Sequence, residues 1–504
     1  MRARHGHRRY RRHGTVSARP PLRGIRNGGQ RHSHRTLRTG YENPAGPGRI
    51  PGRVPRGRVP CARCGPQPPG AVRPRTGVLP EDHLRGAAAG PSPFPRTART
   101  GDLAPRDKGP VVSPRSAKSV HYDAIVVGGG VVGVSTAYVL VRRGLSVLLL
   151  ERYAPVHEHG SSHGDSRMIR FDYEENVYVE MASRAFRAWE DLAKRLGRPV
   201  FRRTGICNLA PAGAEVLETL ETRLRDCELP YERLASPSFA RRFPQLSLPP
   251  HSEAIYQPDS AVLFADEVVR SLWDCVREDG VDALTETKVA SIVPSDGRVE
   301  VTATDGRTWS GACLVLATGS WSDRWLNVLG IDVDLVVTRE LLAYFPQAGS
   351  VPHEAGAMPN VIDYHTPDPF YCVPQVRVPG VKAGCHRTGR VVEADDPEVV
   401  DGANLAAVRE FIGRRCPHLS RDPVAVKHCL YTNSADYHFI LDRHPDHANV
   451  VLAAGFSGHG FKFGPVLGEI LAARLFDEAP PVDTSLFGLE RFSGQGALRP
   501  RTLA

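Results

Sequence analysis

The stretch from Tyr122 to Glu151, YDAIVVGGGVVGVSTAYVLVRRGLSVLLLE, constrains the fold more than any other part of the chain. An apolar run at Ala124–Val127 predicts a buried parallel strand, a helical segment follows at Val131–Arg143, and Leu145–Leu150 predicts a second strand. Between the first strand and the helix stand three glycines at G-x-G-x-x-G spacing, namely Gly128, Gly130 and Gly133. Strand, glycine turn, helix and strand in this order predict a dinucleotide-binding α/β unit.

The same stretch carries the groups that a dinucleotide needs. The glycines let the backbone approach a pyrophosphate, whose charge then rests on amides at the positive end of the helix dipole. Glu151, directly after the second strand, is placed to accept hydrogen bonds from the adenosine ribose. Farther along, CLVLATG predicts a strand over Cys313–Thr318 that ends in Gly319, a third contact typical of such domains.

A membrane span is the alternative for this region, because Ala124–Val141 carries no charge. The run contains four glycines, however, and it barely reaches the ~20 residues that a span needs. We therefore expect no transmembrane segment.

Residues 1–120 differ in composition from the rest of the chain. They hold 26 basic and 5 acidic residues, whereas the rest holds 39 basic and 50 acidic ones, so the net charge of +10 comes from this segment. With 18 of the 43 prolines and no long apolar run, it cannot bury enough surface to fold, and we expect a disordered tail. The favoured interpretation is a tail without a specific role, or upstream sequence read from a misplaced start, since the next methionine is Met168.

Other interpretations of this tail give it a function. An arginine-rich arm can bind RNA or another polyanion through counterion release, and a segment poor in acids can be a transit peptide. Its arginine pairs resemble a twin-arginine signal, but no apolar segment follows them. The C-x-x-C pair at 61–64 has no second Cys or His pair at zinc spacing, so we expect no metal site.

The remaining ~385 residues are too many for one small core and suit two domains. Their eight cysteines are scattered without paired spacing, which favours a reducing compartment over a disulfide framework. No secretory signal or peroxisomal address is recognisable in them. We therefore expect a cytoplasmic protein.

Hydrophobic periodicity predicts further elements along this part of the chain. Helices are expected at Tyr178–Leu196, around Ala214–Arg225, and at Ala265–Glu278, Leu405–Arg414 and Pro465–Leu475. Strands are expected within Phe201–Ala210, Ala254–Phe264, Val333–Phe345 and Pro369–Lys382, at Val450–Ala454, and as a hairpin over Val289–Thr304.

The motifs from Tyr122 to Phe492 together resemble the amine-oxidising flavoenzymes related to monomeric sarcosine oxidase, N-methyltryptophan oxidase and pipecolate oxidase. The fingerprint itself is shared by many flavoproteins. The more restrictive pieces are GSSHGDSRMIR (160–170), YQPDSAVLF (256–264), VKAGCH (381–386), CLYT (429–432) and AAGFSGHGFKFGP (453–465).

The resemblance implies an α/β fold, α+β overall, in which a Rossmann-like FAD domain is interleaved with a substrate domain built on an antiparallel or mixed sheet. FAD-binding segments are then expected at 121–200, 266–335 and 425–504, the last including a C-terminal tail. Substrate-domain segments are expected at 201–265 and 336–424.

The resemblance also implies how FAD is held. The GHGFK segment, with Gly458 and Gly460, caps the flavin, and Cys429 matches a cysteine bonded to the flavin ring through a thioether. The alternative for Cys429 is a buried, inert thiol.

Substrate and oxygen residues follow from the same resemblance. Arg170 and Lys462 match the pair that grips the substrate carboxylate, with Arg offering a bidentate fork and Lys a point charge. Lys382 matches the lysine that activates oxygen, where a fixed cation stabilises developing negative charge. The remaining matches are His163 and Arg167 near the flavin ring, His386 on the substrate cavity, and Tyr371 and Tyr431 as substrate contacts. A structural role is the alternative for each histidine and for Arg167.

The implied function is FAD-dependent oxidation of the C–N bond of a secondary amino acid to an imine, with O₂ reduced to H₂O₂. Sarcosine, an N-methyl amino acid or a cyclic imino acid such as pipecolate would be the substrate, and a monomer is expected. The neighbours of Lys382 and the segment Met358–Tyr371 depart from any one subfamily, so the side chain of the substrate does not carry over. Two alternative functions are a flavin dehydrogenase that passes electrons to a carrier and a polyanion-binding protein that acts through the tail. We do not expect nucleic acid to be the partner.

Overall fold

The structure is a computed structural model that describes residues 121–493. The segment for which the composition predicts a disordered tail, residues 1–120, lies outside the described residues, and so do residues 494–504.

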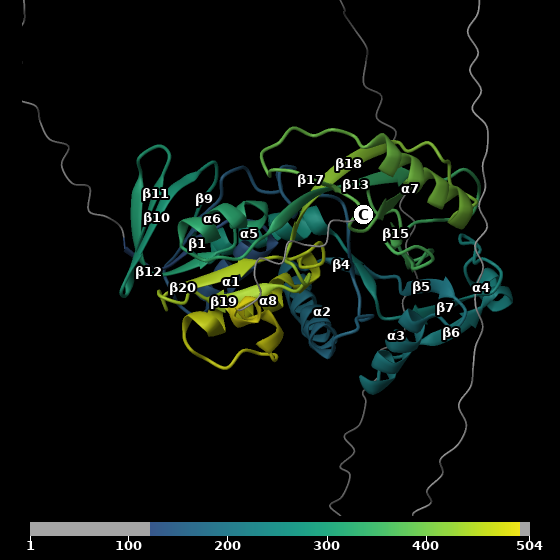
Figure 1. Cartoon of the computed structure of the whole chain (residues 1–504), viewed down its shortest axis with the longest axis horizontal. Helices are drawn as coiled ribbons and strands as arrows, with labels where there is room; N and C mark the ends of the chain where they lie inside the picture. The colour runs from purple at the N-terminus through teal and green to yellow at the C-terminus, as the bar shows by residue number, and fades with distance from the viewer. Residues whose placement is uncertain (1–120, 494–504) are drawn as a thin grey trace, which may run out of the picture. The chain divides into compact units, whose positions relative to one another are not determined.

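The first sheet has eight strands and a parallel centre in the order β20–β12–β1–β2–β9. Strand β12 is long enough to pair with β20 over one half and with β11 of the β10–β11 hairpin over the other, while β19 adds an antiparallel edge to β20. Figure 1 shows this sheet with the hairpin at one end. Its strands are β1 (His121–Val127), β2 (Val147–Leu150), β9 (Asp282–Leu284), β10 (Val289–Ser295), β11 (Arg298–Ala303), β12 (Thr308–Leu316), β19 (Ile440–Arg443) and β20 (Val450–Ala454).

Both faces of this sheet are covered, as its apolar strands predict. Ala124 and Val126 of β1 face a core shared with α1 (Val131–Arg142), α5 (Ala265–Glu278) and α8 (Gly464–Leu475). Ile125 and Val127 face a second core shared with the β10–β11 hairpin and α6 (Ser322–Val328). The expected strand–turn–helix–strand unit is therefore confirmed.

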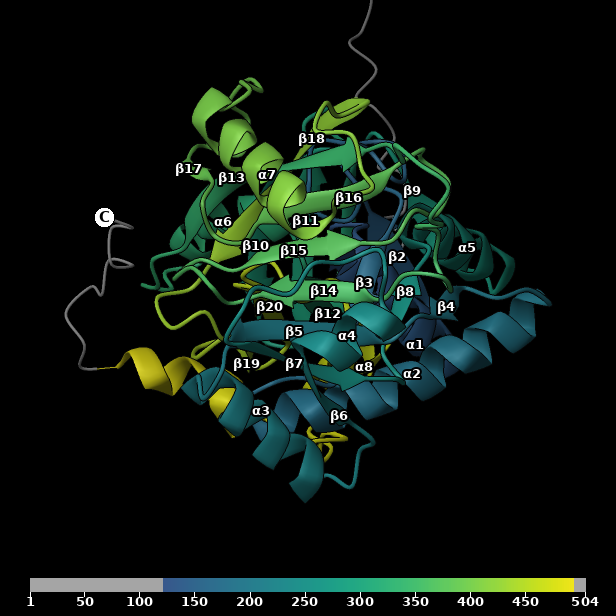
Figure 2. The same ribbon diagram turned by 90° about the vertical axis from the view of Figure 1, so that its right-hand side faces the viewer.

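The second large sheet has nine strands in the order β17–β13–β16–β15–β14–β5–β7–β6, with β18 on the other side of β13. All its pairings are antiparallel except β14 with β5, so the sheet is mixed. Figure 2 shows it face-on with α7 in front. Its strands are β5 (Ile206–Pro211), β6 (Glu232–Ala235), β7 (Ser252–Gln257), β13 (Val336–Phe345), β14 (Asn360–Asp363), β15 (Phe370–Val373), β16 (Val381–Cys385), β17 (Arg390–Val391) and β18 (Ala425–Asn433).

Two of the expected strand segments are interrupted. The segment Phe201–Ala210 is divided into β4 (Phe201–Arg203) and β5, because the chain turns at Gly205, whose φ is +69°. A Cβ at Gly205 would lie 2.3 Å from the Tyr256 ring. Ala254–Phe264 likewise contains β7 and β8 (Ala261–Leu263). Strands β4 and β8 form a separate small sheet with β3 (Arg167–Ile169), which was not expected from the sequence.

The two large sheets are interleaved along the chain. The first takes its strands from 121–150, 282–316 and 440–454, and the second from 206–257 and 336–433. The predicted fold class, a Rossmann-like parallel sheet with a separate mixed sheet, is confirmed. The domain boundaries stay a prediction, and a division by sheets would assign β18 to the substrate segment instead of the final FAD-binding segment.

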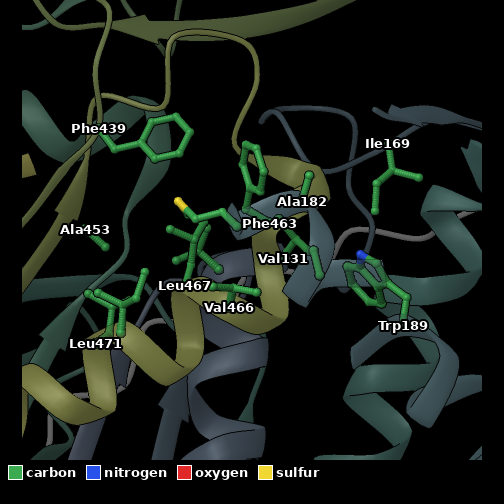
Figure 3. Close-up of a cluster of buried hydrophobic side chains, with 14 of the residues drawn as sticks. Val131, Ile169, Ala182, Trp189, Phe439, Ala453, Phe463, Val466, Leu467 and Leu471 are labelled. Atoms are coloured by element: carbon green, nitrogen blue, oxygen red, sulfur yellow. The ribbon is translucent and has the colours of Figure 1, made fainter. Parts of the chain in front are cut away.

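Helix α2 (Asn176–Leu196) and helix α8 carry the largest apolar cluster, which Figure 3 shows around Phe463, Leu467 and Trp189. The indole Nε1 of Trp189 donates to the carbonyl oxygen of Lys462 at 2.9 Å, so this core also fixes the backbone that carries Lys462. The other helices are α3 (Glu215–Asp226), α4 (Ser236–Arg242) and α7 (Gly402–Arg415), with short 3-10 turns η1 (Gly319–Trp321), η2 (Phe461–Phe463), η3 (Ser485–Phe487) and η4 (Leu489–Phe492). Within residues 121–493, no helix has the length and apolar character that crossing a membrane would require.

Candidate functional site

A cavity of about 740 Å³ is lined by segments from both large sheets. The glycine turn after β1 forms one part of its wall, and strands β16 and β18 with the 456–462 segment form others. The predicted site residues on this wall are Gly128, Gly130, Glu151, Arg167, Arg170, Gly319, Tyr371, Lys382, His386, Cys429, Tyr431, Gly458, Gly460 and Lys462. Two further predicted residues, Gly133 and His163, are not part of this wall. Segments more than 300 residues apart thus meet in one cavity.

The turn between β1 and α1 has no room for side chains. Gly128 has a φ of +103°, and a Cβ there would lie 2.2 Å from the carbonyl oxygen of Ala317. A Cβ on Gly133 would lie 1.7 Å from the carbonyl oxygen of Gly128, so this glycine lets the helix pack against the turn without touching the cavity. The absence of side chains leaves the backbone open to a ligand at the start of α1.

Glu151 stands at the end of β2 beside this turn, 6% exposed. One carboxylate oxygen accepts from the amide of Gly129 at 2.6 Å, and the other accepts from the amide of Tyr153 at 2.9 Å. Trp273 of α5 donates to the carbonyl oxygen of Gly129 at 3.0 Å. The open glycine turn and the acidic side chain held at its rim fit the pyrophosphate and ribose of FAD.

Arg170 follows β3, and it is already paired within the protein. Its guanidinium lies 3.1 Å from the carboxylate of Asp172, whose side chain is fully buried, and it also donates to the Asp172 carbonyl oxygen. The same group lies 4.1 Å from the centre of the Tyr173 ring. Burial disfavours the charge of Arg170, but Asp172 and the nearby tyrosines raise its pKa above the usual value. Arg170 is therefore a fixed cation on the cavity wall.

Lys462 is 5% exposed and lies on the same wall. Its Nζ donates to the Tyr173 hydroxyl at 2.7 Å and to the His459 carbonyl oxygen at 2.8 Å. Burial, and then the charge of Arg170, hold the pKa of Lys462 well below its usual value. A bound anion would stabilise the protonated form of Lys462 against both effects.

Lys382 lies on β16, 4% exposed, and its Nζ donates to the carbonyl oxygen of Ser166. Burial, and then the charge of Arg167, lower the pKa of Lys382 to about 7. The lysine can therefore exchange between its charged and neutral forms near neutral pH, which an exposed lysine cannot do.

Arg167 fixes the loop that carries His163, and the Nε2 of His163 is buried without a hydrogen-bond partner among residues 121–493. The guanidinium of Arg167 donates to the carbonyl oxygens of Ser161, His163 and Ser166 at 2.9, 2.6 and 2.9 Å, so it holds the 161–166 loop in place. Burial, and then Arg167, lower the pKa of His163 to about 4, so this side chain is neutral at pH 7. Arg167 lines the cavity, whereas His163 does not.

Cys429 lies on β18 opposite Glu340 of β13 and lines the cavity. Burial raises the pKa of its thiol to about 11, while Arg167 and Lys382 act in the opposite direction. In this state the thiol is protonated at pH 7, and the covalent bond to flavin stays a prediction.

His386 and Tyr431 meet on the cavity wall, with the imidazole Nδ1 3.3 Å from the tyrosine hydroxyl. The Tyr431 ring packs on Gly458, where a Cβ would lie 2.2 Å from it. Tyr371 lies close to Gly384 of β16 in the same way, with its hydroxyl 2.7 Å from where a Cβ would stand. Burial raises the pKa of both tyrosines, so each presents a neutral hydroxyl to the cavity.

Sequence reasoning missed several residues of this wall. Asp172 and Tyr173 contact the two predicted anion-binding cations and lie within three residues of Arg170, so their proximity in sequence was a usable signal. Arg387 and Tyr437 stack on each other across 50 residues, and no local pattern predicts that contact. Among residues 121–493, no group of three or more His, Cys, Asp or Glu side chains is placed to hold a metal ion.

The sequence model of the FAD dependent oxidoreductase family matches residues 123–474 of this chain. Monomeric sarcosine oxidase of a Bacillus species is 32% identical over 404 residues, which are 76% of this chain and 100% of that protein. Peroxisomal sarcosine oxidase of Homo sapiens is 32% identical, covering 74% of this chain and 97% of that protein. N-methyl-L-tryptophan oxidase of Salmonella agona is 31% identical, and the match covers 74% of this chain and 100% of that protein.

Solved structures share the fold at lower identity. NikD, described as an unusual amino acid oxidase essential for nikkomycin biosynthesis, superposes with a TM-score of 0.66 at 24% identity, covering 73% of this chain and 97% of that chain. L-proline dehydrogenase from P. horikoshii superposes with a TM-score of 0.65 at 21% identity, and the match covers 75% of this chain and 99% of that chain.

Proposed function

The chain belongs to the FAD dependent oxidoreductase family, in the group that includes the sarcosine oxidases, and on that premise we propose that it oxidises the C–N bond of a secondary amino acid with O₂ as acceptor. FAD is the cofactor of this family. The proposal rests above all on one observation. The cavity that begins at the glycine turn is also lined by three basic side chains, Arg170, Lys462 and Lys382, and by the thiol of Cys429.

We infer that the Arg170 and Lys462 side chains bind the carboxylate of the substrate. Two cations around one carboxylate form charge-assisted hydrogen bonds, and the planar guanidinium also fixes the orientation of the carboxylate. The positive charge of both disfavours a protonated amine close by, so the amine nitrogen keeps its lone pair. The hydroxyls of Tyr431 and Tyr371 and the neutral imidazole of His386 line the space for the rest of the substrate.

The oxidation step balances with the amine substrate and O₂ alone. The substrate group CH–NH loses two electrons and two protons to become C=N, and O₂ gains two electrons and two protons to become H₂O₂. When bound, FAD supplies the two-electron acceptor that lies between these halves. Water then hydrolyses the imine to a carbonyl compound and an amine. Lys382 holds a positive charge where O₂ becomes negative, and Arg167 keeps the adjacent loop in place.

Cytoplasmic location and a monomeric state stay predictions. The human relative is named a peroxisomal enzyme. The rival function, a dehydrogenase that uses a carrier in place of O₂, shares this fold, as the L-proline dehydrogenase structure illustrates.

The purified enzyme should release H₂O₂ when given sarcosine, N-methyl amino acids, pipecolate or proline, with at least one of them turned over quickly. Peroxide release and oxygen uptake, measured together across this panel, test the proposal. Substrate-dependent reduction of an artificial electron acceptor without oxygen uptake would instead favour the dehydrogenase.

Cys429→Ala should give an enzyme whose flavin is released by acid, whereas the yellow colour of the wild type should stay with the precipitated polypeptide. The reason is that Cys429 is the thiol of β18 that lines the cavity. Flavin absorbance of the supernatant and pellet after acid precipitation measures this. Cys385→Ala is the matched control, because this buried thiol of β16 lies outside the cavity wall. Acid release of the flavin from the wild type would show that no covalent bond exists.

A further inference from the structure

Arg387, directly after His386, has an unusual backbone conformation on the cavity wall. Its φ is +64°, a region that residues other than glycine seldom adopt. Tyr437, also on the wall, has a φ of +62°, and the guanidinium carbon of Arg387 lies 3.8 Å from the centre of the Tyr437 ring. Two strained residues from different segments therefore stack on each other at the cavity.

A buried carboxylate holds the turn that carries Arg387. One oxygen of Glu340 accepts from the amides of Thr388 and Gly389 at 3.2 and 3.0 Å, and the other accepts from the Thr338 hydroxyl at 2.6 Å. Left-handed backbone at a residue with a side chain costs free energy and persists only where the surroundings impose it. Glu340 imposes it here, so the position of Arg387 is built into the fold.

The guanidinium of Arg387 has donors to spare. Within residues 121–493 it forms no ion pair, and its Nε is buried without a hydrogen-bond partner. The charge of Arg387 acts against the burial that raises the pKa of Glu340, whose oxygens bind the Thr338 hydroxyl and the amides of Thr388 and Gly389. Asp172 faces Arg170, and Asp436 binds Arg491 at 2.7 Å. Stacking on Tyr437 occupies the face of the guanidinium and leaves the N–H groups at its edge free for a carboxylate.

Arg387 acts on the same space as the two carboxylate-binding cations. Burial, then Arg387, Arg170 and Lys462 in that order, lower the pKa of His386 to about 3. Burial raises the pKa of the half-buried Tyr364, which also lines the cavity, while the charges of both Arg170 and Arg387 act to lower it by less. Arg170, Lys462 and Arg387 therefore all line the cavity that contains His386 and Tyr364, which is more basic groups than a single carboxylate requires.

We propose that Arg387, held against Tyr437, binds a second anionic group of the substrate, so that the substrate is an N-alkyl amino acid with an acidic side chain, such as N-methylaspartate or N-methylglutamate. This inference rests on the proposed function. The second carboxylate takes no part in the oxidation, so the reaction keeps the balance given above. Its role is to select and orient the substrate.

Binding of unreactive ligands tests the inference without turnover. Succinate and glutarate, each compared with its monoamide, are titrated into the holoenzyme by calorimetry. The wild type should bind the better dicarboxylate about 10- to 100-fold more tightly than its monoamide, because a charge-assisted contact is gained. Arg387→Gln should remove this preference, whereas Arg387→Lys, which keeps the charge without the planar fork, should keep part of it.

Matched variants separate this role from a general loss of charge or fold. Arg390→Gln removes a charge three residues away that is exposed and paired with Asp401, and it should leave the preference unchanged. Tyr437→Phe keeps the ring that supports the guanidinium and should also keep it. Equal affinity for dicarboxylate and monoamide in the wild type, or an equal loss in the Arg387 and Arg390 variants, would overturn the inference.

Turnover distinguishes failure of the inference from failure of the proposed function. The kcat/KM for N-methyl-L-glutamate should exceed that for N-methyl-L-glutamine about 10- to 100-fold in the wild type and become similar in Arg387→Gln. If neutral N-methyl amino acids release H₂O₂ as well as the acidic ones do, the oxidase function stands and the acidic subsite is wrong. If no secondary amino acid releases H₂O₂, the proposed function is wrong, while the ligand titration still decides whether Arg387 binds an anion.

Discussion

Replacing Lys382 by methionine should slow the reaction of the reduced enzyme with O₂ by about 10²–10³-fold and leave reduction by the substrate nearly unchanged. Methionine keeps roughly the length of the side chain in a site that is 4% exposed, so the packing of β16 should survive. What is lost is a cation where negative charge develops on oxygen. Stopped-flow absorbance of the two half-reactions measures the effect separately.

The same half-reaction should depend on pH. Burial and then Arg167 lower the pKa of Lys382 to about 7, so the lysine carries its charge below that pH and loses it above. Reaction with O₂ should therefore slow as the pH rises through about 7, and the Lys382→Met enzyme should lack this step. Lys194→Met, which removes an exposed surface charge, is the control. Equal slowing of both half-reactions would place Lys382 on the substrate side or in the fold.

Arg170→Lys should preserve much of the affinity for the substrate and lower the rate of reduction by about 10²-fold. Lysine keeps the charge but not the fork that sets the plane of the carboxylate, and misplacing the reacting bond by ~1 Å costs about that much. Dissociation constants and limiting reduction rates from anaerobic stopped-flow titrations separate the two effects. Simple N-methylamines, which lack the carboxylate, should be poor substrates of the wild type and lose little in the variant.

Removing the charge altogether needs a second substitution. Asp172 is fully buried beside Arg170, and a buried carboxylate left without its cation costs about 3–5 kcal/mol of stability. Arg170→Met is therefore best made together with Asp172→Asn, with Asp172→Asn alone as the control. The double variant should lose carboxylate affinity, whereas the control, in which Asp172 no longer competes for the guanidinium, should bind the carboxylate at least as tightly as the wild type. Amines that lose as much as amino acids would show that Arg170 is not the carboxylate clamp.

Arg170 and Arg387 differ in their partners within the protein, and this difference predicts different roles in binding a substrate with two carboxylates. Arg170 forms an ion pair with an internal acid, whereas Arg387 packs on the ring of Tyr437 and forms no ion pair within residues 121–493. A ligand carboxylate at Arg387 therefore displaces no internal ion pair. We expect selectivity between substrates to depend more on Arg387 and the orientation of the reacting bond more on Arg170.

Local pattern alone predicts the elements that hold the cofactor region. The apolar run of β1, the glycines after it and the periodicity of α1 act over a few residues, and the structure reproduces them closely. Helix α5 at Ala265–Glu278 and strand β20 at Val450–Ala454 have the predicted bounds for the same reason. The glycines were predictable because only a residue without a Cβ fits within 2.2 Å of a carbonyl oxygen.

Tertiary structure decides which of these charged residues meet. The ion pair of Arg170 with Asp172 is local, but the stack of Arg387 on Tyr437 joins segments on either side of β18 in the sequence, and the hydrogen bond of Lys462 to Tyr173 joins residues 289 apart. The pKa of Lys382 near 7 follows from burial that only the packed sheets provide. The sequence by itself therefore determined the glycine turn, the family motifs and many of the strands and helices, because these are short-range patterns, whereas the small sheet of β3, β4 and β8 was not expected from it. The balance of charges that would select the substrate arises from long-range contacts, which no spacing along the chain records.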